Sequence, residues 1–542
     1  MTPEARLCAD FDIARADGPV ALTLTFPSFF PDTPPQITPR DGVRLSNHQY
    51  GAGGELCLEY RPDNWDPAFT GAMMIESAHR LLSGERPSPG ATATVDNAHR
   101  TTVGQDVRGS FNRLLLPGDL VNVMGSLALH QPVELETSEH FSAGHWLAFV
   151  RRIGTKEEPI WNWDTKFAGL RKRTGIAVKI IPSVRNGVVA TYDFFKTVVS
   201  TLKRPDLESL VASSQEEFAM LIECDTQISM MSLSSGSGNR AVFDYRTVVL
   251  PKDAPRIPAE YERLDRATVA IVGCGSVGSK IAATLARSGI GRFVLVDGDV
   301  LLPGNLVRND LDWRSVGLNK PNAVSERIKT INPSAAVTVH RILLGGQESS
   351  ASTDAALEAI GRSDLIVDAT ADAQVFNLCA AVARNERKVM VWGEVFAGGV
   401  GGLVARLRPD QEPVPHAARR QILAWCDDHG IDVPQGASDQ YGLQLYEDLP
   451  PLIADDAEVS LIAGHMSRLA IDALVRDASI FPHAAYAIGL KAEWIFQAPF
   501  DTWPIDLVPL GEWGPQKDER LAEELEAFTS EFFPDLSEGD EG

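Results

Sequence analysis

The sequence has few cysteines, no surplus of basic residues and no long apolar run, and each absence excludes a class of protein. No stretch reaches the roughly 18 apolar residues of a membrane helix, and the first residues lack the basic and apolar segments of a signal peptide. The six cysteines form no CxxC pair, which argues against a disulfide framework or a zinc ribbon. We therefore expect a cytoplasmic protein that is neither exported nor membrane-spanning. The cysteines are Cys8, Cys57, Cys224, Cys274, Cys379 and Cys426.

Acidic residues outnumber basic ones by 73 to 50, so the formal net charge is −23. Such a surface repels phosphate backbones and anionic lipids, which excludes nucleic acid and membrane as the main partners. Any phosphate must then be bound by a local site. The 44% hydrophobic content is that of a globular protein, and 542 residues suggest about three or four domains.

Residue patterns predict a multidomain chain of α+β and α/β parts. Residues 1–90 contain short alternating segments followed by helical spacing after Pro67, which predicts an antiparallel sheet and one helix. The next part mixes strands and helices without a recognisable catalytic constellation, and we expect its segment 232–238 to be a flexible loop. The predicted domains are 1–90, a linker domain 91–255, a Rossmann-like domain 256–510 and an acidic tail 511–542.

A glycine-rich loop lies where a phosphate-binding loop must lie. An apolar strand, 269–272, runs into Gly273-x-Gly275-x-x-Gly278, and a helix and second strand follow. Backbone N–H groups at the start of that helix can bind an anion. Asp297, 19 residues after Gly278, can accept hydrogen bonds from ribose hydroxyls. These features fit NAD as well as ATP, so both remain open at this point.

The residues that follow are more specific. Asp297 and Asp299 are succeeded by Asn305, Arg308 and Lys320, in the segments Asn-Leu-Val-Arg and Gly-Leu-Asn-Lys. This order resembles the adenylation core shared by ubiquitin-activating enzymes and the ThiF- and MoeB-type adenylyltransferases, over about 200 residues from 265 to 475. The resemblance implies a Rossmann-like adenylation domain that uses ATP and Mg²⁺.

The same resemblance implies roles for individual residues. Arg308 and Lys320 would bind the phosphates of ATP, because adenylation needs cations there. The metal would be held by Asp372 or Asp368, whose spacing of four residues departs from the family's three; Asp372 is the first candidate. Arg246 matches an arginine that the family takes from a second subunit, which implies a homodimer.

The N-terminal domain has a second set of motifs. A Pro-rich segment, 26–35, precedes Cys57 by 22 residues, and Trp65 follows Cys57 by eight. This spacing resembles that of ubiquitin-conjugating (UBC-fold) enzymes, which implies that Cys57 carries a protein as a thioester. Asn47-His48-Gln49 stands where the family has its oxyanion triplet; Asn47, His48 and the amide of Gln49 are all candidates for the donor, with His48 favoured.

The whole chain is similar to the conjugating–activating fusions of bacterial antiphage islands. That resemblance implies ATP-dependent activation of a protein C-terminus, either a ubiquitin-like protein or a nucleotidyltransferase, and its transfer to lysines of target proteins. Cys426, the only thiol of the segment 409–455, would be the relay cysteine, although a structural cysteine in a helix is the competing interpretation. A sulfur-carrier-type adenylyltransferase with an N-terminal docking module, and an NAD-sensing scaffold, are the alternatives.

Overall fold

The computed structural model forms two compact units, residues 1–252 and 253–542, each described here by itself. No helix within the described parts is both long and apolar enough to cross a membrane. Most of the predicted acidic tail and the middle of the predicted relay segment lie outside the described residues. The structure describes residues 6–15, 18–41, 45–46, 48–50, 53–85, 104, 107–163, 171–181, 192–212, 218–224, 227–236, 239–250, 258–431 and 454–516.

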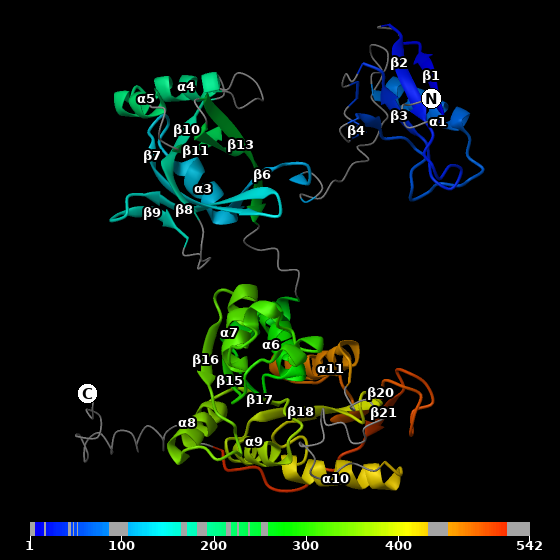
Figure 1. Ribbon diagram of the computed structural model, residues 1–542, viewed down its shortest axis with the longest axis vertical. Helices are drawn as coiled ribbons and strands as arrows, with labels where there is room; N and C mark the ends of the chain where they lie inside the picture. Colours follow the sequence, from blue (N-terminus) through cyan, green and yellow to red (C-terminus); the bar gives the residue numbers. More distant parts are fainter. Residues whose placement is uncertain are drawn as a thin grey trace. The chain divides into compact units, whose positions relative to one another are not determined.

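The N-terminal part consists of a small antiparallel sheet covered by one helix (Figure 1). Leu22, Leu24 and Ile37 of the sheet pack against Met74 and Leu82 of the helix, because alternate strand residues and every third or fourth helix residue are apolar. The predicted sheet and helix are confirmed. The elements are β1 (Cys8–Ile13), β2 (Val20–Thr25), β3 (Gln36–Pro39), the hairpin β4 (Gln49–Tyr50) and β5 (Glu55–Leu56), and α1 (Gly71–Glu85).

The second part of this unit is one mixed sheet in the order β6-β13-β12-β11-β10-β7-β8-β9, in which β6 also pairs with β8 and so joins the two ends of a seven-strand run. Separate apolar cores lie under α3 and under α4 and α5. The elements are β6 (Asn112–Pro117), α3 (Gly118–Ser126), β7 (Val133–Ser142), β8 (His145–Gly154), β9 (Pro159–Asn162), β10 (Arg171–Ile180), α4 (Tyr192–Thr201), α5 (Pro205–Ala212), β11 (Phe218–Cys224), β12 (Gln227–Gly236) and β13 (Asn239–Leu250).

The predicted loop 232–238 is wrong over most of its length. Residues 232–236 end strand β12 and pair with β13, from Ser232 opposite Phe243 to Gly236 opposite Asn239. Serine and glycine suggest flexibility by composition, but the alternating Met231 and Leu233 are buried in the core and hold the strand in register. Residues 237 and 238 lie outside the described residues.

The C-terminal unit is a doubly wound sheet in the order β16-β15-β14-β17-β18-β19-β20-β21, with parallel pairing from β16 to β18 and antiparallel pairing beyond. Its strands are β14 (Thr268–Val272), β15 (Arg292–Val296), β16 (Ala336–His340), β17 (Leu365–Asp368), β18 (Val389–Phe396), β19 (Gly401–Leu407), β20 (Ala485–Gly489) and β21 (Thr502–Ile505). The strand order reverses at β14, so the carboxyl ends of β14, β15 and β17 form the ligand-binding edge of such a fold.

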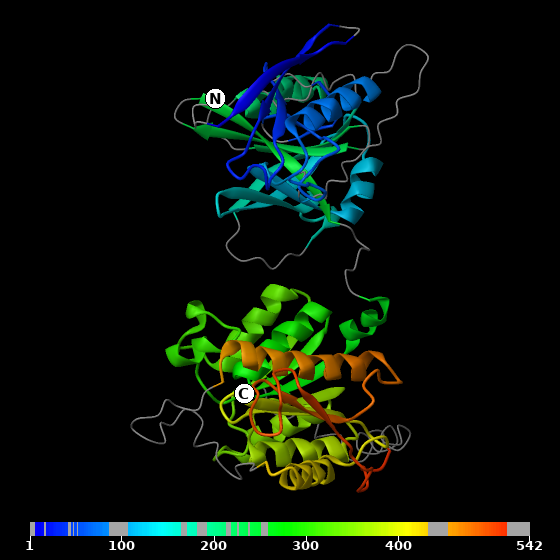
Figure 2. The same cartoon turned by 90° about the vertical axis from the view of Figure 1, so that its right-hand side faces the viewer.

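Helices cover both faces of this sheet (Figure 2). One apolar core includes residues of α6, α7 and α11, and the other includes residues of α8, α9 and α10. The predicted βαβ unit and Rossmann-like fold are confirmed. The helices are η2 (Ala259–Arg266), α6 (Ser276–Ser288), η3 (Pro303–Val307), η4 (Trp313–Ser315), α7 (Lys320–Ile331), α8 (Ser350–Gly361), α9 (Ala373–Asn385), α10 (Pro415–Asp428) and α11 (Asp456–Val475).

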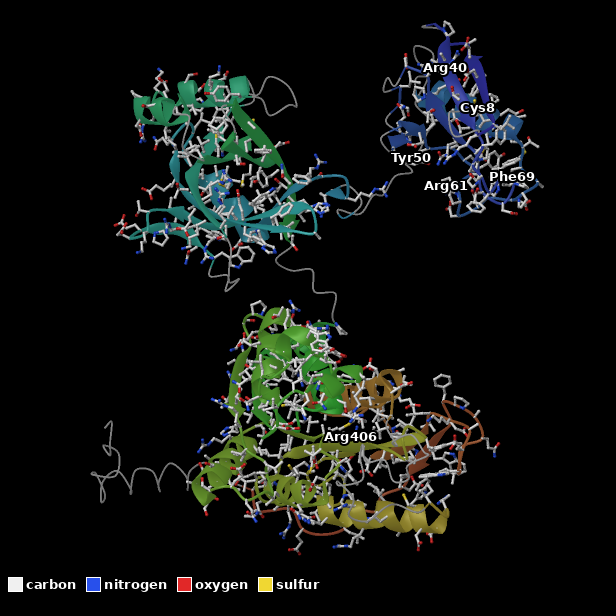
Figure 3. The ribbon with its side chains drawn as sticks, in the orientation of Figure 1. Cys8, Arg40, Tyr50, Arg61, Phe69 and Arg406 are labelled. Atoms are coloured by element: carbon white, nitrogen blue, oxygen red, sulfur yellow. The ribbon has the colours of Figure 1, made fainter. Side chains whose placement is uncertain are left out.

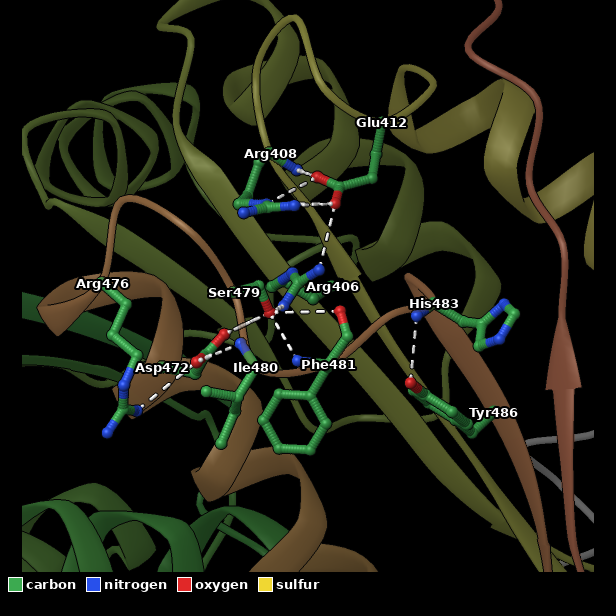
Figure 4. Close-up of polar contacts among 10 residues, drawn as sticks. All are labelled: Arg406, Arg408, Glu412, Asp472, Arg476, Ser479, Ile480, Phe481, His483 and Tyr486. Carbon is green, nitrogen blue, oxygen red and sulfur yellow. Dashed lines mark hydrogen bonds and ion pairs between the residues drawn. The ribbon is translucent and has the colours of Figure 1, made fainter.

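A buried ionic network fastens the antiparallel end of the sheet to α11 (Figure 4). Arg406 on β19 is only 1% exposed and donates to Asp472 of α11 and to Glu412, each at 3.1 Å. Ser479 bonds to both Arg406 and Asp472. Each buried charge thus has its partners, which is the condition for tolerating such a group inside a protein.

Candidate active site

The glycine loop has a backbone conformation and close contacts that leave no room for side chains at Gly273 and Gly278. Gly273 has φ +89°, and a Cβ on Gly278 would lie 1.8 Å from the carbonyl oxygen of Gly273. The loop therefore turns tightly and brings α6 close to the end of β14. Gly275 precedes the first turn of α6 without a side-chain cap, and an added Cβ there meets nothing within 4 Å. An uncapped helix start beside open space fits a bound phosphate.

Asp297 holds this loop from the neighbouring strand. Its Oδ2 accepts a hydrogen bond from the N–H of Cys274 at 2.7 Å, and its Oδ1 accepts one from the N–H of Asp299 at 2.8 Å. Burial raises the pKa of Asp297, although these two hydrogen bonds oppose that rise. Each carboxylate oxygen keeps a further lone pair with which it can accept a hydrogen bond from a ribose hydroxyl.

Asp299 and Lys320 form an ion pair at the same edge of the sheet. Lys320 is the first residue of α7, and its backbone N–H also donates to the carbonyl of Asp299 at 2.9 Å. This hydrogen bond ties the start of the helix to the residue that pairs with the lysine side chain. Burial alone would raise the pKa of Asp299, but Lys320 outweighs it, so that the pKa is lowered. The lysine side chain is only 11% exposed and is therefore a fixed cation.

Asn305 shapes the turn that leads to Arg308. The Asn305 Oδ1 accepts from the N–H of Leu302 at 2.9 Å, and its carbonyl accepts from the N–H of Arg308 at 3.2 Å. Arg308 follows directly after η3. The Asn-Leu-Val-Arg motif thus has a local structural reason, since the asparagine closes the turn that sets the position of the arginine backbone.

Asp368 is the last residue of β17, the neighbour of β14, and Asp372 lies four residues further along the chain. Asp368 is fully buried, and its Oδ1 accepts hydrogen bonds from the backbone and hydroxyl of Thr370 at 3.1 and 2.6 Å. Its buried Oδ2 has no hydrogen-bond partner among the described residues. Burial raises the pKa of Asp368 to about 6, and the charge of Asp372 adds to the rise.

Asp372 begins helix α9 by accepting hydrogen bonds from the N–H groups of Gln374 and Val375 at 2.7 and 3.1 Å. In the described part of the chain no three His, Cys, Asp or Glu residues gather as a metal site. Mg²⁺ is often held by one or two carboxylates together with substrate phosphates. Asp368, with its unpartnered oxygen, and Asp372 fit that arrangement, and both stay candidates.

Cys426 lies on α10, half buried against the core of the sheet. Burial raises the pKa of its thiol to about 11, and the charge of Glu394 on β18 contributes to the rise. The thiol is therefore protonated at neutral pH in this conformation, which is unfavourable for a relay nucleophile. Cys274 and Cys379 are fully buried residues of the core.

Arg246 lies in strand β13, opposite Arg113 of β6. It belongs to the first compact unit, whereas the glycine loop belongs to the second. The predicted contribution of this arginine to the site of another subunit stays a prediction.

Cys57 follows β5, and its N–H donates to the carbonyl of His48 at 2.7 Å. The residue is 8% exposed. Burial raises the pKa of the thiol, while the charge of Arg61 and a hydrogen bond from it act in the opposite direction. His48 is buried beside the strand pair, so the structure brings its backbone to Cys57; Asn47 lies outside the described residues.

Sequence reasoning missed three polar groups of these sites. Glu394 interrupts the apolar strand β18, and this interruption was its only signal in the sequence. Arg419, on α10, lies over the ring of Phe376 at 5.0 Å, and its charge lowers the pKa of Glu394, which burial raises. Arg61 is a lone cation four residues after Cys57, a pattern that the family motif does not include.

Comparison with known proteins identifies part of the chain. Residues 253–485 match the ThiF family. A Sinorhizobium fredii protein, y4oA, is 32% identical over 184 residues, covering 32% of this chain and 31% of that protein. The ATP-dependent ubiquitin transferase-like protein Cap2 of Enterobacter hormaechei is 32% identical over 123 residues, covering 23% and 20%. Ubiquitin-like modifier-activating enzyme 5 of Caenorhabditis elegans is 40% identical over 81 residues, covering 15% and 19%.

The chain thus spans about a fifth to a third of the length of these curated relatives. Among solved structures, E. coli MccB with a MccA variant aligns over 46% of this chain and 68% of that one, at 16% identity and a TM-score of 0.35. The family match covers the glycine loop, both aspartate pairs and the segment from Asn305 to Lys320. The match of residues 253–485 to the ThiF family therefore supports an E1-like adenylation domain in this part of the chain.

Proposed function

We propose that this chain activates the C-terminal carboxylate of a protein with ATP and transfers it through Cys57 to lysines of target proteins. The observation that carries the activation step is the uncapped start of α6 beside the fixed cation Lys320, because together they provide a binding site for phosphates. The similarity to Cap2, an ATP-dependent ubiquitin transferase-like protein, supports the same chemistry.

In the proposed first step, a carboxylate oxygen of the substrate attacks the α-phosphorus of ATP, and pyrophosphate leaves with the electrons of the broken P–O bond. Arg308 and Lys320 would stabilise the phosphate charge, and Asp297 would bind the ribose. Mg²⁺, held by Asp372 or Asp368, would neutralise charge on the phosphates.

In the second step, a thiolate replaces AMP to form a thioester, which a lysine amine then attacks. Cys426 would be the relay and Cys57 the final carrier. Since the pKa of Cys426 is raised to about 11, the relay role requires that α10 carries this thiol into a more exposed or cationic setting before it reacts.

The substrate class in this proposal is a ubiquitin-like protein or a nucleotidyltransferase, and the setting is the cytoplasm of a bacterium that defends itself against phage. The order of the modules, with the cysteine module first and the ThiF domain last, supports this setting by its similarity to antiphage fusion enzymes. A homodimer, with Arg246 shared between subunits, belongs to the same proposal.

A second candidate is a sulfur-carrier-type adenylyltransferase whose first 90 residues form a docking module. Burial raises the pKa of both Cys57 and Cys426, which disfavours the thiolates that a thioester relay needs and so favours this candidate. That candidate keeps the adenylation step and has no thioester at Cys57.

The test combines pyrophosphate exchange with adduct mapping. The full chain is incubated with ATP, Mg²⁺ and either a ubiquitin-like protein or a nucleotidyltransferase encoded beside its gene. We expect exchange, a reductant-labile adduct and reductant-resistant lysine conjugates, the conjugates being lost in Cys57→Ala. Cys8→Ala is the matched control, because Cys8 lies on β1 of the same domain.

Each other outcome favours a different function. Pyrophosphate exchange with a reductant-labile adduct that survives in Cys57→Ala and disappears in Cys426→Ala would favour the sulfur-carrier candidate. Conjugation that persists in Cys426→Ala would eliminate the relay. Tight binding of NAD without any exchange would refute both enzymatic candidates and favour the scaffold.

A further inference from the structure

Three arginines of the C-terminal unit form no ion pair with any acid that the structure describes: Arg384 at the end of α9, and Arg419 and Arg420 on α10. Arg384 and Arg420 are exposed, and Arg419 is half-buried. Arg406 of the same unit, labelled in Figure 3, is the opposite case, because it is buried and paired with two carboxylates. In a chain with a net charge of −23, unpaired cations on one surface point to a site for an anion.

The two helices lie side by side and bring these cations together (Figure 1, Figure 2). The guanidinium of Arg419 lies over the ring of Phe376 at 5.0 Å, and the ring of His416, one turn earlier on α10, lies 6.1 Å from the same ring. Burial lowers the pKa of His416, and the positive charges of Arg420, Arg419 and Arg384 lower it further. We call Arg384, His416, Arg419 and Arg420 the basic surface of α9 and α10.

Residues 507–514 form a strap that joins the end of α9 to the start of α10. The N–H of Val414, the residue before α10, donates to the carbonyl of Leu510 at 3.0 Å, and the Nε of Arg384 donates to the carbonyl of Glu512 at 2.8 Å. These carbonyls are two residues apart, which is at most about 7 Å along an extended chain. The end of α9 therefore meets the start of α10, and Arg384 belongs to the same surface as the arginines of α10.

The chain itself has a strongly acidic segment close to this surface. Residues 518–541 contain ten Asp or Glu and one Arg, and they lie outside the described residues. The strap leads to them, and the N–H of its Gly514 donates to the carbonyl of Arg384 at 2.9 Å. Asp518 follows four residues later, so it can lie no more than about 14 Å from that point. So short a tether gives a high effective concentration, at which weak ion pairs suffice for binding.

Exposed apolar side chains accompany the cations. Val508 and Leu510 of the strap are 60% and 54% exposed. The backbone of Val508 is held to α10 by two hydrogen bonds with the side chain of Gln421, at 2.9 and 2.8 Å. A segment that carries both acids and apolar side chains can add burial of apolar area to its ion pairs here. The apolar residues of the acidic segment include Leu521, Leu525 and Phe528.

We propose that the basic surface of α9 and α10 binds the acidic segment 518–541 of the same chain. Carboxylates of the segment pair with the three arginines, and its apolar residues contact the strap. A second copy of the chain carries the same segment, but only the chain's own segment is tethered beside the surface. The segment then lies on α10, the helix that carries Cys426. This binding goes beyond the proposed conjugation and does not depend on it.

The test is zero-length cross-linking in the full chain. A carbodiimide joins a lysine amine to a carboxylate that it contacts, so Arg420→Lys adds an amine to the surface and keeps the charge. We expect cross-links from this position to carboxylates of residues 518–541, identified by mass spectrometry of the peptides. At 1 M salt, where the Debye length is about 3 Å, their yield should fall about tenfold. Arg287→Lys is the matched control, because Arg287 is an exposed arginine of α6, which covers the other core.

An equal mixture of unlabelled and isotope-labelled chains identifies the source of the bound segment. Cross-links that stay within chains of one isotope support the proposal. Cross-links that join the two isotopes would assign the segment to a second copy and overturn it. Absence of cross-links to residues 518–541 in Arg420→Lys, or an equal yield in Arg287→Lys, would overturn it as well.

Cleavage by chymotrypsin after Phe528 is an independent measurement on the full chain. Binding protects the segment, and Arg420→Glu replaces attraction by repulsion, so this variant should be cleaved about fivefold faster at low salt. Arg287→Glu should be cleaved at the rate of the unaltered chain. An unchanged rate in Arg420→Glu, or an equal increase in Arg287→Glu, contradicts the proposal. Neither ATP nor a substrate protein is present, so failure here is distinguishable from failure of the proposed conjugation.

Discussion

The thiol of Cys426 offers a direct test of the relay hypothesis. Its pKa is raised from 9.0 to about 11 by burial and by the charge of Glu394. At pH 8 a thiol with a pKa of 9 is about 10% ionised, whereas one with a pKa of about 11 is about 0.1% ionised, a difference of about a hundredfold. Because the thiolate is the nucleophile, alkylation of Cys426 at pH 8 should be slower than that of an unperturbed thiol by about this factor.

The alkylation rate of Cys426 should rise with pH, because the thiolate is the nucleophile. Each pH increase of one unit should raise the alkylation rate about tenfold until the pH reaches about 11. Glu394→Gln removes the electrostatic contribution and leaves the burial, so it should speed the reaction only in part. The rate is measured with iodoacetamide from pH 7 to pH 11, and each cysteine is quantified by its own peptide.

The control is Cys8, a partly exposed thiol of the other unit that Glu394→Gln should leave unchanged. If Cys426 reacts at pH 8 as fast as a free thiol, then α10 does not keep it in this buried setting and the reasoning is refuted. If ATP and a substrate protein make it react much faster, the activation that the relay requires is present.

Three further changes test the structure and the site. Gly278→Ala forces a Cβ to within 1.8 Å of the Gly273 carbonyl and should destabilise the C-terminal unit by about 1–3 kcal/mol in urea denaturation and abolish pyrophosphate exchange. Lys320→Met removes a fixed cation from the phosphate site and should lower the exchange rate about a hundredfold with little change in stability. Arg406→Met takes from buried Asp472 its buried ion-pair partner at 3.1 Å and leaves it the longer contact with Arg476 at 3.4 Å. The change should cost about 3–5 kcal/mol in urea denaturation, most of which Asp472→Leu should restore in the double variant.

Each of these predictions has a matched control and a contrary result. Gly464→Ala adds a methyl group that meets nothing within 4 Å, and equal losses in Gly464→Ala and Gly278→Ala would contradict the steric argument. Lys329→Met removes an exposed cation of α7, and an equal fall in exchange there would show only a general charge effect. If the double variant is as unstable as Arg406→Met alone, the unpaired charge of Asp472 is not the cause of the lost stability.

Several features follow from the sequence alone because they depend on near neighbours. Apolar periodicity determines the strand and helix around the glycine loop, and the loop's tight turn requires glycine at Gly273 and Gly278. The order Asp299, Asn305, Arg308, Lys320 belongs to local turns and to the ion pair at the start of α7, so it identifies the adenylation domain without coordinates. The sheet and helix of the first 90 residues are determined by the same kind of local pattern.

Only the tertiary structure decided the features that depend on distant residues. Residues 232–236 became a strand because β13 pairs with them, although their composition is that of a loop. Burial, together with the charge of Glu394 on another element, raises the pKa of Cys426 to about 11, and burial raises the pKa of Asp368 to about 6. Burial and electrostatic contact arise from packing, which spacing along the chain does not contain.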